Sequence, residues 1–154
     1  MVMQFGNTGT YTNSTFREYN SNHHIGFRTC LGFVGAQGAS YIHIKTNIGG
    51  SSNNMVKFEY NGFTYSGNNV HTSVTLYTYE GSANPYQPHY VSWGASGHGI
   101  VNTYYSSDDY LVVVIRTSSA YTGGFLYYQA GRSHYQPDVD IMSFASSNDT
   151  SGAF

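Results

Sequence analysis

Seven histidines and eight acidic residues are the main groups in this 154-residue sequence that could carry acid–base or metal chemistry. His23 and His24 are adjacent, and neighbouring residues of a strand point to opposite faces, so their rings would not share a metal ion. His43 and His71 fall on the expected outward faces of two strands that could be neighbours, where a surface or interface role is favoured over a shared metal. No His-x-His or His-Glu-x-x-His spacing occurs, so the sequence offers no anchor for zinc.

Four of the eight acidic residues form two clusters, Asp108-Asp109 and Asp138-x-Asp140. Both contain oxygen ligands that suit Ca²⁺, but neither has the dense spacing of a calcium loop, and turn capping is the favoured interpretation. A glycosidase needs two carboxylates flanking a bond, and no local motif supplies such a pair. The sequence therefore predicts no enzyme, no metal and no cofactor, with a polysaccharide depolymerase as the enzymatic alternative.

Charge and cysteine content exclude further classes of function. Only 9% of residues are charged and no basic stripe exists, so nucleic-acid binding is not expected. No apolar run approaches the roughly 20 residues that span a bilayer, and the start has no basic segment followed by an apolar one, so neither membrane insertion nor a classical signal peptide is expected. Cys30 is the only cysteine, and its place in an apolar run predicts a buried, inert thiol.

Tyrosine stands out among the remaining groups, since 16 Tyr occur with 18 Gly and many Ser and Asn. Tyr supplies rigid contact area at little cost in side-chain entropy, and Ser, Gly and Asn supply adaptable hydrogen bonds. Flat aromatic faces also stack on the apolar C–H faces of sugar rings. Although most tyrosines of a sandwich pack between strands, the densest group predicts a receptor-binding or ligand-binding patch of Tyr86, His89, Tyr90, Trp93, Tyr104, Tyr105 and Tyr121.

Strands must position these residues, because the composition favours pleated strands and turns and no segment has helical spacing. Residues 41–48 alternate, with Ile42, Ile44 and Ile48 inward, and residues 55–60 and 70–79 alternate in the same way. Turn signals recur roughly every 8 to 12 residues. The sequence thus predicts an all-β fold, an antiparallel, jelly-roll-like β-sandwich of about nine short strands, with strands also at 25–34, 89–94, 100–105, 110–115, 125–130 and 139–145.

Three local features carry further expectations. Asn61-Gly62 predicts a two-residue hairpin, with a bulge in one continuing strand as the alternative. Residues 80–88 contain two of the three prolines and are expected to form a long loop. The segment 110–115 is apolar on both faces, which predicts a central strand covered on both sides, or on one side by a neighbouring subunit.

Residues 1–23 are expected to be an arm or connector, and residues 24–154 the sandwich head.

One strand pattern is formed by the segments 41–48 (YIHIKTNI) and 55–67 (MVKFEYNGFTYSG) together with the apolar strands 70–79 and 110–115. In this pattern, residues 25–145 resemble the C-terminal head domains of bacteriophage tail fibres and related virion receptor-binding proteins. The resemblance implies a β-sandwich head, usually a homotrimer, that is made in the host cytoplasm and displayed on the virion surface. Its partners would be itself, other virion proteins, and a host-surface glycan or protein. The resemblance assigns no binding residues.

Two other functions fit the same residues. A capsid decoration protein or other structural virion protein would have no receptor role and would dock through the arm at 1–23. A cellular carbohydrate-binding module would use the same aromatic surface as a fibre head.

Overall fold

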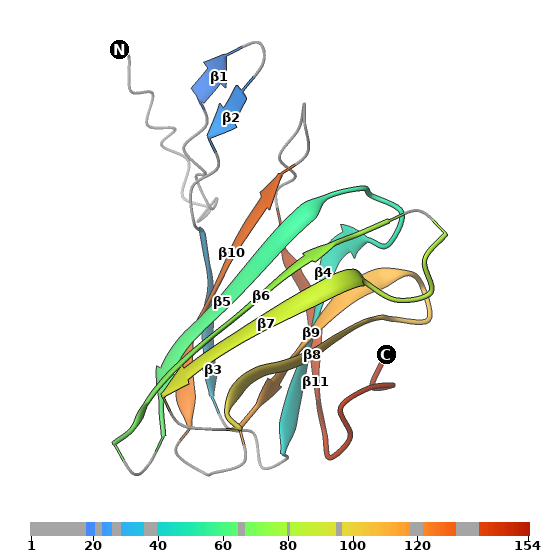
Figure 1. Ribbon diagram of the computed structural model, residues 1–154. Coiled ribbons are helices and arrows are strands. Elements are labelled where there is room, and N and C mark those ends of the chain that lie inside the picture. The colour runs from blue at the N-terminus through green and yellow to red at the C-terminus, as the bar shows by residue number, and fades with distance from the viewer. Residues whose placement is uncertain are drawn as a thin grey trace, which may run out of the picture.

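The computed structural model describes residues 18–20, 23–25, 29–35, 40–64, 67–79, 81–94, 97–117, 122–131 and 139–154. Within this part, nine strands form two antiparallel sheets that pack face to face, and the described residues contain no helix (Figure 1). The predicted all-β sandwich is therefore confirmed. Among the described residues, no helix is long and apolar enough to cross a membrane.

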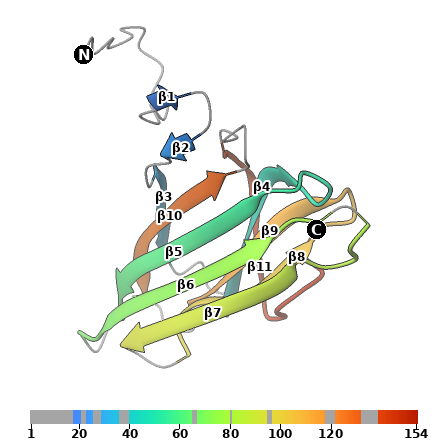
Figure 2. The same ribbon diagram turned by 45° about the horizontal axis from the view of Figure 1, so that its top comes forward.

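The larger sheet has five strands, and its last three form a meander along the chain (Figure 2). In spatial order they are β3 (Thr29–Gly35), β10 (Gly123–Gly131), β5 (Met55–Phe63), β6 (Asn69–Tyr77) and β7 (Tyr86–Gly94). Strand β7 is one edge of this sheet, and all nine of its residues are exposed.

The smaller sheet has four strands. In spatial order they are β11 (Ile141–Ser147), β4 (Tyr41–Gly49), β9 (Tyr110–Arg116) and β8 (Gly99–Tyr105). Strands from early and late in the chain interleave in both sheets, since β10 lies between β3 and β5, and β4 lies between β11 and β9. Such crossovers are typical of Greek-key and jelly-roll sandwiches. A separate hairpin pairs β1 (Glu18–Asn20) with β2 (His23–Ile25).

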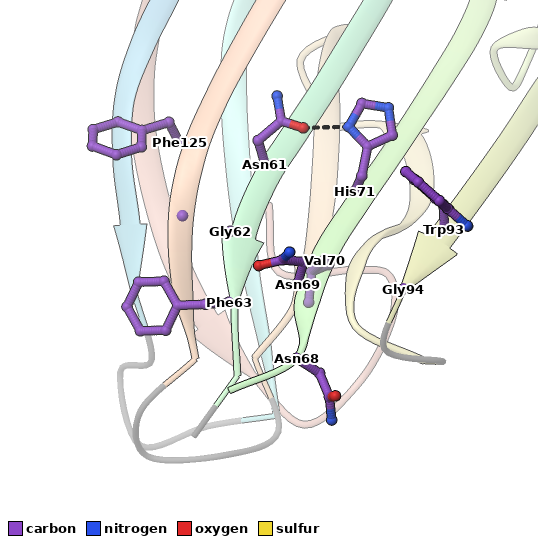
Figure 3. A pocket seen from close by; sticks show the side chains of 11 residues that line it. Asn61, Gly62, Phe63, Asn68, Asn69, Val70, His71, Trp93, Gly94 and Phe125 are labelled. Carbon is purple, nitrogen blue, oxygen red and sulfur yellow. Dashed lines mark hydrogen bonds between the residues drawn. The ribbon is translucent and has the colours of Figure 1, made fainter. Parts of the chain in front are cut away.

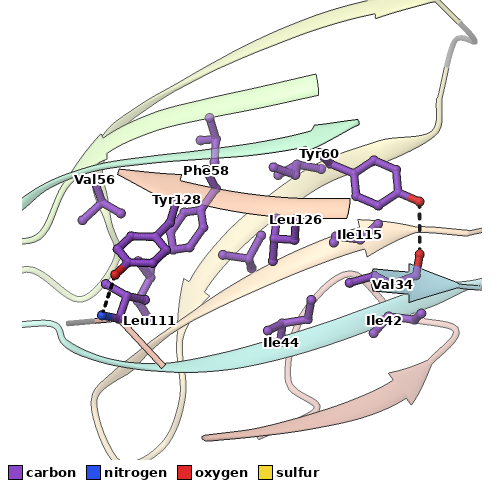
Figure 4. Packing of buried hydrophobic residues seen from close by; sticks show 14 of the residues in the cluster. Val34, Ile42, Ile44, Val56, Phe58, Tyr60, Leu111, Ile115, Leu126 and Tyr128 are labelled. Carbon is purple, nitrogen blue, oxygen red and sulfur yellow. Dashed lines mark hydrogen bonds between the residues drawn. The ribbon is translucent and has the colours of Figure 1, made fainter. Parts of the chain in front are cut away.

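The core lies between the sheets and is built by the predicted alternation. Ile42, Ile44 and Ile48 are buried in it, as are Val56, Phe58 and Tyr60 and also Val70, Val74 and Leu76 (Figure 4). The two tyrosines of this core have satisfied hydroxyls, because that of Tyr60 donates to the Val34 carbonyl at 3.3 Å and that of Tyr128 accepts the Val139 N–H at 3.1 Å. Burial raises the pKa of Tyr60 to about 12.

The segment 148–154, here called the strap, covers the outer face of the four-stranded sheet. Phe154 packs, together with Tyr41 and Val101, against a cluster of Tyr104, Val112 and Val114, and both valines are fully buried. The other face of β9 contributes Leu111, Val113 and Ile115 to the main core. The expectation that this strand is covered on both sides is therefore confirmed, and the second cover comes from the chain itself rather than from a neighbouring subunit.

Two sequence expectations about turns are wrong. Asn61-Gly62 makes neither a hairpin nor a bulge, because β5 continues to Phe63 in unbroken register with β6 and the turn follows that residue. The loop expected over 80–88 ends earlier, since β7 begins at Tyr86. Pro88 is tolerated there because an edge strand has one unpaired side.

The predicted burial of Cys30 is also wrong. Its thiol is exposed, because Cys30 pairs with Tyr127 on the outer face of the edge strand β3. A register shift beside Leu126 sets this pairing. The apolar run around Cys30 therefore does not correspond to a strand buried on both faces.

A pair of facing glycines lets β5 and β10 approach closely, and it provides a test of the packing. Gly62 pairs with Gly124, and a methyl group on Gly124 would lie 2.5 Å from the Asn61 carbonyl oxygen and 2.8 Å from the Tyr60 ring. We expect Gly124→Ala to lower the free energy of unfolding by roughly 1 to 3 kcal/mol. Gly49→Ala is the matched control, because nothing lies within 4 Å of the added methyl there. Equal urea-denaturation midpoints for the two variants would contradict this packing.

Candidate functional site

The predicted patch residues on β7 lie along one exposed edge but do not form one cluster. Tyr86 is at the start of the strand, where its ring centroid lies 6.2 Å from that of Tyr79. Trp93 is seven residues further on, which is about 23 Å along an extended strand. His89 is exposed between them. Tyr90 turns toward the facing sheet, where its hydroxyl lies 3.0 Å from the Thr103 hydroxyl on β8.

The other patch residues lie elsewhere. Tyr104 is buried beneath the strap, where its hydroxyl accepts the Ala153 N–H at 3.2 Å and lies 3.0 Å from His43 Nδ1. Tyr105 is half-buried and packs against the main core, and burial raises its pKa. Tyr121 lies outside the described residues. Of the seven predicted residues, Trp93 is the one that lines the groove described next.

Trp93 belongs to a row of side chains on the outer face of the five-stranded sheet. Phe125 of β10 lies opposite Asn61 of β5, Asn61 opposite His71 of β6, and His71 opposite Trp93 of β7. Antiparallel pairing places directly opposed residues on the same face. The register of three strand pairs therefore brings residues 61, 71, 93 and 125 side by side.

A groove of about 1080 Å³ opens at this row (Figure 3). The Phe63 and Phe125 rings stand on one side of it and the Trp93 indole on the other, while a hydrogen bond joins the Asn61 and His71 side chains between them. The aromatic walls are well exposed, at 80% for Trp93, 49% for Phe63 and 48% for Phe125. The lining comprises Asn61, Gly62, Phe63, Asn68, Asn69, Val70, His71, Trp93, Gly94, Gly124 and Phe125.

Glycine shapes the end of the groove beside Trp93. Gly94 has φ 95°, and a side chain there would collide with the Asn69 carbonyl of β6. Only glycine adopts this backbone conformation readily. Gly94 thus keeps the chain close to β6 where β7 ends, immediately after the indole.

The lining of the groove contains no Lys, Arg, Asp or Glu. The nearest charged residues along β5, Lys57 and Glu59, form an ion pair with each other at 2.7 Å. The polar side-chain groups of the groove are the three asparagine amides, the His71 imidazole and the Trp93 indole N–H. An uncharged ligand that combines apolar faces with hydroxyl or amide groups matches this lining.

The titratable clusters singled out in the sequence do not meet at this groove. His43 and His71 belong to different sheets, so the expectation that their strands are neighbours is wrong. Both face outward from the sandwich as expected, but the strap covers His43, which is fully buried. Asp108 lies in the turn before β9, where it binds Lys45 Nζ at 2.6 Å and accepts the Ser106 hydroxyl at 2.7 Å. These contacts lower its pKa and fit a turn-stabilising role. Among the described residues, no group of three His, Cys, Asp or Glu side chains could hold a metal.

Comparison with known proteins found no relative for this chain. No family model matches the sequence. No curated protein and no solved structure matches it either. The geometry of the groove is therefore the basis for inferring a function.

Sequence reasoning missed most of the residues that build the groove, namely Asn61, Phe63, Asn69, His71 and Phe125. The Asn61-Gly62 dipeptide predicts a turn, and the sequence singles out His71 only as one member of a histidine pair. The alternation of residues 70–79 places His71 on the outward face. Extending the alternation of residues 55–60 by one residue would have placed Asn61 there too, and this was the available signal. Strand order and register were the missing information.

Proposed function

We propose that this chain is a non-catalytic recognition domain that binds an uncharged glycan in the groove beside Trp93. The observation that carries the proposal is the neutral groove with aromatic walls and amide groups between them. Aromatic faces stack on the apolar C–H faces of a sugar ring, while asparagine amides donate to and accept from its hydroxyl groups. Binding sites of this kind are typically concave and largely apolar, with a few placed polar groups.

The lining also favours binding over hydrolysis. A glycosidase uses two carboxyl groups on either side of the scissile bond. The groove contains no carboxyl group. The proposal therefore assigns the site to attachment rather than to depolymerisation of the glycan.

Within this proposal, the chain serves as the head of a phage fibre or as another receptor-binding protein on the virion surface, as the resemblance in strand pattern suggests. Homotrimers would present three grooves, and linked binding sites raise avidity by roughly 100- to 10,000-fold when their geometry allows simultaneous engagement. Native mass spectrometry tests the trimer, and a monomer at micromolar concentration would contradict it.

A glycan array probed with the purified chain tests the binding proposal. We expect signal on a restricted set of neutral glycans and no preference for sulfated or sialylated ones. A reducing-sugar assay on the polysaccharides that bind is expected to detect no release. An array without any specific signal would contradict glycan recognition, and release of reducing sugar would contradict the non-catalytic role.

A structural virion role is the second candidate, and it is favoured by apolar residues that stand exposed on the outer face outside the groove. Met55 is 69% exposed and Val91 is 48% exposed. In this alternative the outer face docks onto a neighbouring coat or tail subunit. Incorporation of a Met55→Ser, Val91→Ser variant into particles separates the two functions, because only a docking face requires these side chains.

A further inference from the structure

The strap is held on the four-stranded sheet by hydrogen bonds along its length. The Ser40 N–H donates to Asn148 Oδ1 at 3.2 Å, and Asn102 Nδ2 donates to the Thr150 carbonyl at 2.8 Å. Near its end, the Ala153 N–H donates to the Tyr104 hydroxyl. His43 supplies the central contact, with Nε2 at 2.9 Å from the Asp149 carbonyl oxygen.

The hydrogen bonds of this central contact determine the protonation state of His43. The Asp149 carbonyl only accepts, so His43 Nε2 must carry a hydrogen and donate it. The Tyr104 hydroxyl accepts the Ala153 N–H and lies 3.0 Å from His43 Nδ1, to which it can donate its own hydrogen when that nitrogen is unprotonated. A neutral imidazole therefore gives a partner to each group in this series of hydrogen bonds. A second proton, on Nδ1, would make that nitrogen a donor, so the Tyr104 hydroxyl would lose it as an acceptor and would have to turn its hydrogen elsewhere.

The surroundings of His43 add to the cost of a charge. Its side chain is fully buried, and the residues opposite it on the adjacent strands are Val114 and Ala145. Burial lowers the pKa of His43 and outweighs the Asp149 carbonyl and carboxylate, which raise it. The other titratable groups on this face are Tyr41 and Lys45 of β4, Tyr104 of β8, and Tyr110 and Arg116 of β9. The Lys45 ammonium is bound to Asp108.

We propose that the strap is a proton-operated latch, closed while His43 is neutral and released when His43 is protonated. Release would uncover Val112 and Val114 together with Tyr104, which the strap now covers. The latched state has the lower pKa, so latch stability is complete above about pH 6.5, the ordinary value for histidine, and is lost as pH falls toward the latched pKa. The inference concerns a different sheet from the groove and does not depend on glycan binding.

Hydrogen exchange of the strap amides tests the latch in the unmodified protein. After correction for intrinsic exchange rates, protection of the Ala153 amide is expected to fall by up to about 30-fold between pH 7.5 and pH 5.0, the limit for one proton with an ordinary pKa of about 6.5 in the released state. Amides of β5 and β10 should keep their protection. Equal strap protection at both pH values would overturn the proposal.

A pair of variants assigns the effect to His43. His43→Gln keeps a side-chain N–H for the Asp149 carbonyl but cannot take up a proton, so its strap protection is expected to be independent of pH. His98→Gln is the matched control, because burial and Arg116 also lower the pKa of His98, which lies outside the strap contacts. Its strap should remain pH-dependent, and pH dependence that persists in His43→Gln would overturn the proposal. If His43→Gln does not fold, NMR titration of His43 in the natural sequence decides, because a pKa above 6.5 contradicts the latch.

Discussion

Replacing Trp93 with alanine is expected to weaken binding of the glycans selected on the array by roughly 10- to 100-fold, which corresponds to about 1.4 to 2.8 kcal/mol. The indole is 80% exposed and forms one whole wall of the groove, so its loss removes the stacking surface opposite Phe63 and Phe125. Exposed aromatic anchors of this type dominate binding energy. The free energy of unfolding should change by no more than about 0.5 kcal/mol, because the side chain lies on the surface of an edge strand. Calorimetric titration and urea denaturation provide the two measurements.

Met55→Ala is the matched control for this variant. Met55 is an exposed apolar residue on the same outer face, but it lies at the opposite end of β5 from Asn61 and Phe63 and does not line the groove. Its removal should leave the affinity unchanged. Equal losses of affinity in the two variants would indicate a diffuse apolar surface and would contradict a groove.

Deleting residues 148–154 is expected to destabilise the domain by about 3 kcal/mol, from exposure of apolar surface and from lost hydrogen bonds. Val112 and Val114 are fully buried beneath the strap, and His43 and Tyr104 would lose their partners in it. Chemical denaturation measures the loss of stability. Increased fluorescence of an apolar dye would report the uncovered valines.

Ser151→Ala is the control within the strap, because Ser151 is exposed. It should change the free energy of unfolding by less than about 0.5 kcal/mol. If the deletion lowers the free energy of unfolding no more than this substitution does, then the strap is not part of the folded unit.

The sheets were predictable from the sequence because the sandwich core imposes a local two-residue period. Ile42, Ile44 and Ile48 alternate with polar residues, and this pattern requires no knowledge of which strands are neighbours. The apolar residues on both faces of β9 likewise indicated two covers. These β9 residues did not identify the strap as the second cover. Phe154 is the only large apolar residue of that segment, and no local sequence pattern indicates where the segment folds back.

The groove was not predictable for the same physical reason. Its walls come from Phe63, Trp93 and Phe125, which are brought together only by the pairing of β10 with β5, β5 with β6 and β6 with β7. Density of tyrosine along the chain selected residues such as Tyr104, which the fold places under the strap. Linear clustering identifies an exposed strand such as β7, but register determines which of its residues share a site.

The most direct test of the groove is the fluorescence of Trp93, because it is the only tryptophan in the chain. Titration with a glycan selected on the array is expected to shift the Trp93 emission to shorter wavelength and to reduce its quenching by acrylamide. Both changes should give the same dissociation constant as calorimetry. Tight binding of the glycan with unchanged emission and unchanged quenching would place the ligand elsewhere and contradict the proposed site.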